Sequence, residues 1–569
     1  MKRTLLLAAV VLAIALALAF LALLSLLSGS GPNHGAAILS WKLAGALPER
    51  APGAPFALLD DAPPLTLAEV YSALRAARRD PSLSTIAVTF GEPDFGLAKA
   101  EEVRRLLGAV RDAGKDLECY LETAGEGSNG TLVYFLATAC SKISIAPAGE
   151  LNLLGLYADG VFLRSTLDKL QIQPNFSSAG IYKSAIETYT RTDHSPAAEA
   201  AIGAVLDHHF ELIVRAISER RKLSPARVLE LIGGAPYSAA DAVRLGLVDR
   251  VLFPDEFEQQ YRATSGEDEV DLKTYATQSA GSGGTVAVVF AEGGIARGES
   301  GSGGFTGQAT LGSDDFAETL RQVRDDASID AVVLRVDSPG GSALASDLIL
   351  RELDLLAQKK PLVASLSDVA ASGGYYIVSH APTIVAESST ITGSIGVFSG
   401  KLVTGGLERN VLGITRDPLK RGANSDLYSS AVPFSRAQAR SIQAAVERTY
   451  ETFLAHVATG RKLTRDEVHA VAQGRIWTGQ DAERHKLVDH LGGLDRAIAL
   501  ALQAAKLPEE TLPRLRYYPE PPSVFDLLMD QQQAMISLDV RAVTDLLVDQ
   551  PARLLELPEE LAHLSRPFS

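Results

Sequence analysis

TVAVVFAEG, residues 285–293, is a short apolar run rich in β-branched residues, which is typical of a buried strand. It is followed by DDFAETLRQVRDD (314–326), an amphipathic stretch that predicts a helix, and by IDAVVLRVDS (329–338), which predicts another strand. The alternation continues with PLVASLS (361–367) as a strand and ASGGYYIVSHA (371–381) as a helix. Strands that alternate with amphipathic helices form parallel sheets covered on both faces, so this pattern predicts an α/β fold.

The chain contains two copies of this pattern. LRAARRDPSL (74–83) matches LRQVRDDASI (320–329), and YSAADAVRLGLVDRV (237–251) matches WTGQDAERHKLVDHL (477–491). The spacing between matching segments stays between about 240 and 246 residues, as expected for one domain present twice. The polar, Gly/Ser-rich stretch at 266–284 separates the copies and predicts a linker.

The N-terminus carries the clearest targeting signal. An uncharged apolar run from residue 4 to residue 27 follows Lys2 and Arg3. At about 20 residues per bilayer crossing it is long enough to span a membrane, and no A-x-A cleavage site typical of a secretory leader follows it. Because the positive charges precede the run, the short N-terminus should stay in the cytoplasm. We therefore predict a single uncleaved anchor, with lipid around residues 4–27 and the rest of the chain on the outer face.

The predicted organisation has five parts. They are the cytoplasmic tip and anchor at 1–28, an N-terminal domain at 29–265, a linker at 266–284, a C-terminal domain at 285–505 and a helical tail at 506–569. With 569 residues, 46% of them hydrophobic, the chain can build a core in each domain.

Charge and cysteine usage exclude several classes of protein. The formal net charge is −15 and no cluster of basic residues is long enough to follow a phosphate backbone, so nucleic acid is not an expected partner. Cys119 and Cys140 are too few for a disulfide framework and are not spaced as metal ligands. We expect two buried, unpaired cysteines, with a single bridge as the alternative.

The two copies differ at polar positions that could carry chemistry. The second copy has the paired glycines Gly340 and Gly341 at a strand end, where the first copy has GEPDFG (91–96). Backbone N–H groups of such glycines can hold a developing oxyanion, although an ordinary glycine turn is the alternative. Ser372 lies between a predicted strand and a predicted helix, where it is either a nucleophile or an N-cap. Its nearest counterpart in the first copy is Ser128, which an insertion displaces.

A serine nucleophile needs a base. His380 lies eight residues after Ser372 on the same predicted helix, about 12 Å along its axis, and is too distant to serve. The first copy has Lys183 where the second has Ser425, so the two halves carry complementary parts of one composite site. A lysine can act as a base when burial lowers its pKa, and a hydroxyl such as that of Ser394 can orient it without adding charge. An exposed structural lysine is the alternative.

The motifs VDSPGGS, SDVAASGGYYI and TGSIGVF, together with YKSA in the first half, closely resemble signal peptide peptidase A, or protease IV. The resemblance is to the long, duplicated, membrane-anchored bacterial form and covers most of residues 1–500. It implies tandem domains of the Clp-protease/crotonase superfold and a homotetramer in the bacterial inner membrane, with its catalytic domains in the periplasm. It further implies a serine endopeptidase that degrades signal peptides and other apolar peptides without a metal or cofactor.

The same resemblance implies a role for each candidate residue. Ser372 would be the nucleophile, Lys183 the general base and Ser394 the residue that orients the lysine, while Gly340 and Gly341 would form the oxyanion loop. Three other functions stay open. They are a general envelope quality-control protease with the same mechanism, a non-catalytic membrane scaffold, and a crotonase-like acyl-CoA enzyme on the same fold.

Overall fold

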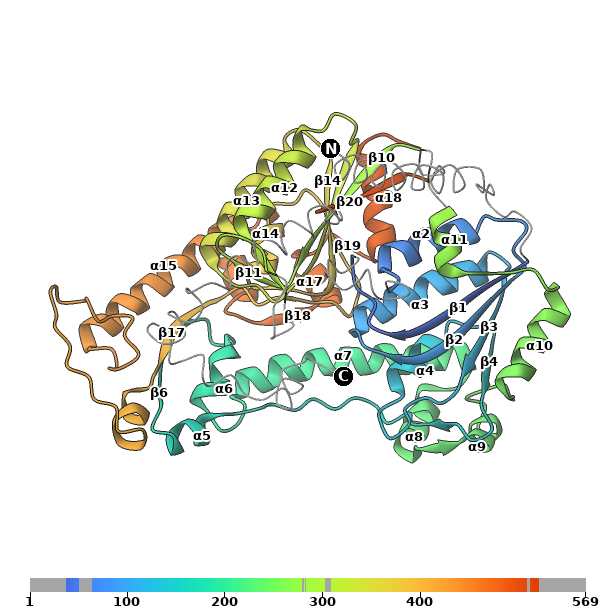
Figure 1. Cartoon of the computed structure of the whole chain (residues 1–569), viewed down its shortest axis with the longest axis horizontal. Helices are drawn as coiled ribbons and strands as arrows, with labels where there is room; N and C mark the ends of the chain where they lie inside the picture. The colour runs from blue at the N-terminus through green and yellow to red at the C-terminus, as the bar shows by residue number, and fades with distance from the viewer. Residues whose placement is uncertain are drawn as a thin grey trace, which may run out of the picture.

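The structure is a computed structural model with two large sheets, three two-stranded sheets and helices packed around them (Figure 1). It describes residues 37–50, 64–278, 281, 283–301, 309–508 and 512–520. The predicted anchor at residues 4–27 and most of the predicted tail lie outside these ranges. Across the described ranges, no helix combines the length and apolar character needed to cross a membrane.

The first half is built on a six-stranded sheet in the order β8-β4-β3-β2-β1-β9, and all its neighbouring strands are parallel. The strands are β1 (Ile38–Gly45), β2 (Thr85–Pro93), β3 (Asp116–Leu121), β4 (Lys142–Ile145), β8 (Arg250–Val251) and β9 (Glu269–Asp271). The helices of this half are α2 (Leu67–Ala77), α3 (Leu97–Asp112), α4 (Thr131–Ala137), α5 (Arg164–Lys169), α6 (Glu187–Thr190), α7 (Pro196–Arg221), α8 (Pro225–Gly234), α9 (Ala239–Arg244), α10 (Pro254–Ser265) and α11 (Leu272–Gln278). A parallel sheet flanked by helices agrees with the α/β prediction.

The second half repeats this plan with eight strands. Six follow the order β18-β16-β14-β13-β10-β20, β15 pairs with β14 and β19, and only the β16–β18 pair is antiparallel in this described sheet. The strands are β10 (Thr285–Glu292), β13 (Ala331–Ser338), β14 (Leu362–Ala371), β15 (Ile384–Ala386), β16 (Ile391–Gly393), β18 (Ile476–Thr478), β19 (His490–Leu491) and β20 (Arg514–Tyr518). The helices are α12 (Ser313–Asp325), α13 (Ala343–Ala357), α14 (Gly373–Val378), α15 (Arg436–Arg461), α16 (Arg465–Val471), α17 (Gly479–Arg484) and α18 (Leu494–Ala504).

Strand β10 divides its side chains between two cores. Val286, Val288 and Phe290 belong to the core that is continuous with the first half, whereas Ala287 and Val289 belong to the core of the second half. Successive side chains of a strand point to opposite faces, so one face of the second sheet packs toward the first half. The two copies therefore share a hydrophobic interface and are not independent domains joined only by a linker.

Elements also cross from one half to the other. Strand β6 (Gln173–Ala179) pairs antiparallel with β17 (Val397–Val403), which belongs to the second copy. Helix α7 packs against β18, and α15 packs against β6. In Figure 1, α7 runs from α6 toward α4, below β18. This exchange brings residues near position 180 to the second half.

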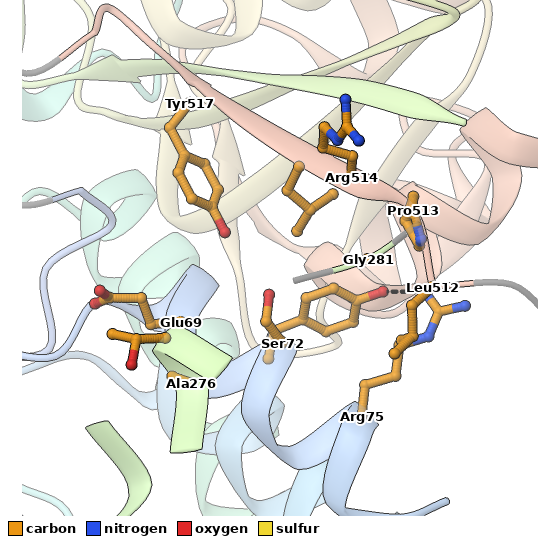
Figure 2. Close-up of a pocket in the computed structure, with 12 residues that line it drawn as sticks. Glu69, Ser72, Arg75, Ala276, Gly281, Leu512, Pro513, Arg514 and Tyr517 are labelled. Carbon is orange, nitrogen blue, oxygen red and sulfur yellow. Dashed lines mark hydrogen bonds between the residues drawn. The ribbon is translucent and has the colours of Figure 1, made fainter. Parts of the chain in front are cut away.

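Two predicted boundaries differ from the structure. The expected linker at 266–284 contains β9, which pairs with β1, and α11, which packs on α2. The expected helical tail from 506 contains β20, which pairs with β10. Each of these strands covers a sheet edge whose backbone N–H and C=O groups would otherwise lack partners. A cavity of about 240 Å³ lies between α2, α11 and β20, and none of the predicted site residues lines it (Figure 2).

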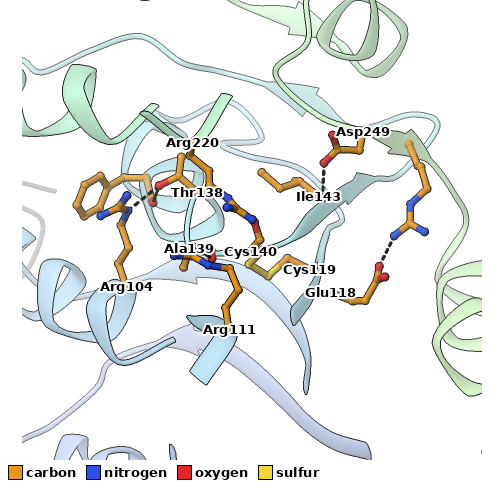
Figure 3. Close-up of a disulfide and its surroundings, with 12 residues drawn as sticks. Arg104, Arg111, Glu118, Cys119, Thr138, Ala139, Cys140, Ile143, Arg220 and Asp249 are labelled. Carbon is orange, nitrogen blue, oxygen red and sulfur yellow. Dashed lines mark hydrogen bonds and ion pairs between the residues drawn. A yellow bond between two sulfur atoms is a disulfide. The ribbon is translucent and has the colours of Figure 1, made fainter. Parts of the chain in front are cut away.

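The expectation of unpaired cysteines is wrong, because Cys119 and Cys140 form a disulfide (Figure 3). Cys119 lies in β3 and Cys140 lies just before the neighbouring β4, and their Cα atoms are 6.0 Å apart. This distance is within the usual range for a bridge, and only the pairing of the two strands reveals it. Arg220 Nε donates a hydrogen bond to the Cys140 carbonyl oxygen (2.7 Å), which fixes the backbone beside the bridge.

Candidate active site

Ser372 occupies the turn between β14 and α14. Its φ of 53° is positive, which is rare for a residue other than glycine and costs about 1–3 kcal/mol. Its N–H donates to the Gly393 carbonyl (2.9 Å), and its own carbonyl accepts from the Tyr376 N–H (2.9 Å). The side chain makes no capping hydrogen bond to α14. The backbone thus takes the N-cap position while the hydroxyl is left for other contacts, which argues against the N-cap alternative.

Lys183 reaches Ser372 because of the β6–β17 pairing. Ala179, the last residue of β6, pairs with Val397, the first residue of β17. The chain leaving β6 then leads to Lys183, while the chain entering β17 comes from Ser394. A register set between the two halves therefore determines which lysine meets which serine.

The distances around the lysine amine are short and nearly equal. Lys183 Nζ lies 3.0 Å from Ser372 Oγ, 3.0 Å from Ser394 Oγ and 3.0 Å from the Ser394 carbonyl oxygen. Ser394 also has a positive φ, 49°, and its N–H donates to the Arg475 carbonyl (2.7 Å). The structure thus brings three of the residues predicted from sequence into one hydrogen-bonded group.

Burial changes the acidity of this lysine. The Lys183 side chain is almost enclosed, with 7% of the residue exposed, and among the described ion pairs none involves it. Desolvation lowers the pKa of Lys183 from 10.5 to about 8. At pH 7.4 roughly one-fifth of such a lysine is neutral, against about one in a thousand for an ordinary one. The exposed-lysine alternative is therefore wrong.

The glycine loop after β13 approaches Ser372 closely. Gly340 has φ +99°, and a methyl group on it would lie 2.8 Å from Ser372 Cβ and 2.5 Å from the Gly373 nitrogen. The Gly340 N–H donates to Ser338 Oγ (3.2 Å), so it already has a partner. The Gly341 N–H has no hydrogen-bond partner in the described part of the chain. Its nitrogen is close to Gly373, because a methyl group added to Gly373 would lie 3.0 Å from it. Gly341 and Gly373 therefore offer the available donors, and the sequence argument overlooked Gly373.

The first half has a different counterpart of Ser372 from the one expected. Tyr134 and Tyr375 donate equivalent hydrogen bonds to the carbonyls of Leu247 and Leu487 (2.6 and 2.8 Å). Tyr375 lies three residues after Ser372, and Tyr134 lies three residues after Thr131. The counterpart of Ser372 is therefore Thr131 and not Ser128. Thr131 Oγ1 accepts a hydrogen bond from the Gly155 N–H (3.0 Å) and is buried. This position of the first half thus serves local structure.

Ser425, the counterpart of Lys183, and His380, which the sequence excludes as the base, lie away from this group. Ser425 is exposed and its hydroxyl donates to the Gly422 carbonyl (3.1 Å). His380 Nδ1 lies 3.0 Å from Asp354 Oδ1 and its Nε2 lies 3.3 Å from His456 Nδ1, so both ring nitrogens have partners other than Ser372. In the portion of the chain that the structure describes, no three His, Cys, Asp or Glu side chains are grouped as a metal ion would require.

Comparison with known proteins identifies the family. The model of "Peptidase family S49" matches residues 120–266 and 354–508, one stretch in each half. Protease 4 of Salmonella typhi is 33% identical over 83% of this chain and 76% of its own length. The chloroplastic serine protease SPPA of Arabidopsis thaliana is 31% identical over 78% of this chain and 66% of its own.

Solved structures add little beyond this. ClpP1 from Listeria monocytogenes aligns with 37% of this chain and 94% of its own, at 12% identity and a TM-score of 0.23. A likeness this low carries no argument, so the fold described above depends on strand order and pairing alone. The sequence relatives, by contrast, cover most of both halves. The chain therefore belongs to peptidase family S49, the family of protease 4 and signal peptide peptidase A, and it is a serine peptidase.

Proposed function

We propose that this protein is a membrane-anchored endopeptidase with a Ser372–Lys183 dyad that degrades signal peptides left in the membrane after preprotein processing. The observation that carries the proposal is the 3.0 Å distance between Lys183 Nζ and Ser372 Oγ. The two residues come from different halves, and the lysine is buried without a neighbouring carboxylate that would keep it charged. No carboxylate-oriented histidine is needed in such a site.

The neutral amine has a suitable arrangement of partners. A neutral lysine has two N–H donors and one lone pair. The Ser394 carbonyl and hydroxyl oxygens accept the two donors, which leaves the lone pair directed at the Ser372 hydroxyl. Ser394 thus orients the base without a charge. Lys183 takes the Ser372 proton as Oγ attacks the peptide carbonyl, and it then protonates the leaving amine.

The oxyanion would be held by backbone donors. As the carbonyl carbon becomes tetrahedral, its oxygen gains negative charge close to the Gly341 and Gly373 N–H groups. Gly373 lies at the first position of α14, where an N–H has no partner within the helix. Water activated by Lys183 then attacks the acyl-enzyme, and the same donors stabilise the second tetrahedral intermediate.

An apolar cavity supports the proposed substrate class. A space of about 450 Å³ lies between the halves, beside β14 and β16. Most of its wall is apolar, with Phe95, Leu97 and Leu132 from the first half and Val369 and Ile391 from the second. The carboxylates of Asp337 and Asp368 also line it. Signal peptides have apolar cores, and such a cavity suits apolar side chains. An envelope quality-control protease would share the dyad but accept polar chains as readily.

Localisation and assembly belong to the same proposal. A disulfide between Cys119 and Cys140 fits an oxidising compartment outside the cytoplasm, where the predicted anchor would place these domains. Large apolar side chains are exposed at Ile181 (66%), Leu412 (59%) and Leu419 (89%). We propose that these side chains are covered in a homotetramer.

The test uses the full-length protein in detergent and a fluorogenic peptide with a leucine-rich core. Ser372→Ala and Lys183→Met should each lose at least ~1,000-fold in kcat. The matched controls are Ser128→Ala, an exposed serine of the first half, and Lys401→Met, whose amine donates to the Leu427 carbonyl (2.9 Å). Both controls should retain activity.

Three results would redirect the proposal. Activity in Lys183→Met close to that of the wild type would place the base elsewhere. Equal cleavage of a denatured polar protein and of a signal peptide in liposomes would favour envelope quality control over signal-peptide degradation. A wild type that cleaves nothing would favour the scaffold function.

A further inference from the structure

The first turn of helix α3, in the half without the nucleophile, contacts both strands that lead to the candidate site. Lys99 Nζ lies 2.8 Å from Asp337 Oδ2, at the end of β13 where the glycine loop begins. Asp368, in β14 four residues before Ser372, accepts hydrogen bonds from the N–H groups of Gly96 and Lys99 (both 2.9 Å). The N-terminal end of α3 is thus bonded to β13, which leads to the glycine loop, and to β14, which leads to Ser372.

Asp368 replaces the cap that α3 lacks. The N-cap residue is Gly96, which has no side chain to accept a hydrogen bond from the first turn. The Asp368 carboxylate fills this role from the other half and also lies near the positive end of the helix dipole. A methyl group on Gly96 would lie 2.5 Å from Asp368 Oδ1, so the helix end and the strand are in close contact.

Asp337 connects the two strands to one another. Its Oδ1 accepts a hydrogen bond from the Val369 N–H (3.1 Å), while its Oδ2 faces Lys99. Lys99 is 8% exposed and also lies 3.5 Å from Glu49 Oε1 and 3.9 Å from Asp368 Oδ2. Burial raises the pKa of Asp368 to about 6. The positive charge of Lys99 lowers this pKa, and the negative charge of Asp337 raises it further. Apolar residues would join two halves at lower cost, so these charges favour a role in fixing geometry.

We propose that Lys99 and Asp368 are positioning residues that set the separation between the glycine loop and Ser372. Lys99 holds Asp337 at the start of the loop, and Asp368 holds β14 just before the nucleophile, both against the same turn of α3. Neither residue contacts the reacting atoms. The inference depends on the proposed function, because it assumes that the loop supplies oxyanion donors. Loss of one such donor costs about 100- to 1,000-fold in kcat, so a partial displacement should cost less.

The test uses full-length protein in detergent with Lys99→Met, Lys99→Arg and Asp368→Asn. The matched control is Arg105→Met, on the same helix, where Arg105 pairs with Glu387 (2.6 Å) and Asp495 (2.5 Å) of the second half. Arg105 also joins the halves but reaches neither the loop nor β14. For each variant, kcat, KM, the pH profile and the thermal midpoint are measured.

We expect Lys99→Met to lower kcat by ~10- to 100-fold, with KM within ~threefold and the inflection near pH 8 unchanged. Lys99→Arg should recover part of the loss because it restores the charge opposite Asp337. Arg105→Met should lower the thermal midpoint as much as Lys99→Met but leave kcat within ~threefold. If Lys99→Met does not fold, Asp368→Asn, which preserves side-chain size, is expected to lower kcat by ~5- to 30-fold.

Two outcomes overturn the inference. One is an equal loss of kcat in Lys99→Met and Arg105→Met, which would show a general structural effect. The other is unchanged kcat in both Lys99→Met and Asp368→Asn. The wild type and Ser372→Ala separate this failure from failure of the proposed function. A wild type that is inactive, or that does not depend on Ser372, refutes the proposed function itself.

Discussion

Replacing Ser394 by aspartate should move the pH dependence of cleavage to higher pH. The wild-type rate should follow the neutral fraction of Lys183, whose pKa burial lowers to about 8. The rate should therefore rise about tenfold per pH unit below pH 7 and level off above pH 9, with roughly a 90-fold difference between pH 6 and pH 9.

The substitution acts on the amine directly. Ser394 Oγ lies 3.0 Å from Lys183 Nζ, so a carboxylate at this position would stabilise the ammonium form. An opposite charge at such a distance raises a lysine pKa by about 1–3 units. The inflection should move to about pH 9–11, and the rate at pH 7.4 should fall by ~10- to 1,000-fold. Asn and Asp both tolerate the positive φ of Ser394, so the backbone need not change.

Ser394→Asn is the matched control, because asparagine has the size of aspartate without its charge. It should lower the plateau rate through loss of the orienting hydroxyl but keep the inflection near pH 8. Initial rates on a fluorogenic peptide are measured across pH 6–10.5 for the wild type and both variants. The reasoning is refuted if the aspartate and asparagine variants share one inflection, or if the wild-type rate is flat between pH 6 and pH 9.

Three further predictions follow from the same geometry. Gly340→Ala should lower kcat by at least ~100-fold and also lower stability, since its methyl group would lie 2.5 Å from the Gly373 nitrogen and 2.8 Å from Ser372 Cβ. Labelling of the variant with a fluorophosphonate should slow in parallel, and labelling at the wild-type rate would contradict the prediction. Lys183→Met should stabilise the fold by roughly 2–3 kcal/mol at pH 7, because the folded pKa of Lys183, about 8, lies below its unfolded value. The free-energy cost of burying this lysine is fully present below pH 8 and vanishes toward pH 10.5, so denaturant titrations should show the gain in stability at pH 7 and not at pH 10.5. Replacing Cys119 and Cys140 together by alanine should lower stability by about 3 kcal/mol without changing kcat at 25 °C, as measured by urea unfolding and initial rates.

Local patterns in the sequence were sufficient for the fold class and for the choice of residues. The alternation of strands and helices and the repeated segments depend on nearest-neighbour periodicity, which survives without any knowledge of tertiary contacts. The comparison between the copies pointed to Ser372 and Lys183, and the need for an uncharged orienting hydroxyl pointed to Ser394. The structure places Lys183 Nζ 3.0 Å from the hydroxyl oxygen of each serine. Their catalytic roles stay a prediction until the variants are assayed.

Errors arose where the assignment depended on insertions and on chain order. Ser128 was matched to Ser372 across an insertion, whereas the tyrosine hydrogen bonds show that Thr131 occupies the equivalent place. The supposed linker and tail each contribute a strand, because sheet edges accept segments that are polar or short in sequence. The bridge between Cys119 and Cys140 depends on the pairing of β3 with β4, and their spacing of 21 residues gave no sign of it.

The sequence by itself determined that this protein has two related α/β halves, one with a serine and a glycine pair and the other with a lysine. Only the tertiary structure decided that these parts meet, because the register of β6 against β17 sets the position of Lys183. It also decided the positive φ of Ser372 and the contact of Lys99 with Asp337. The contacts of Lys183 with Ser372 and of Lys99 with Asp337 join residues about 190 and 240 positions apart, and no local pattern encodes such long-range contacts.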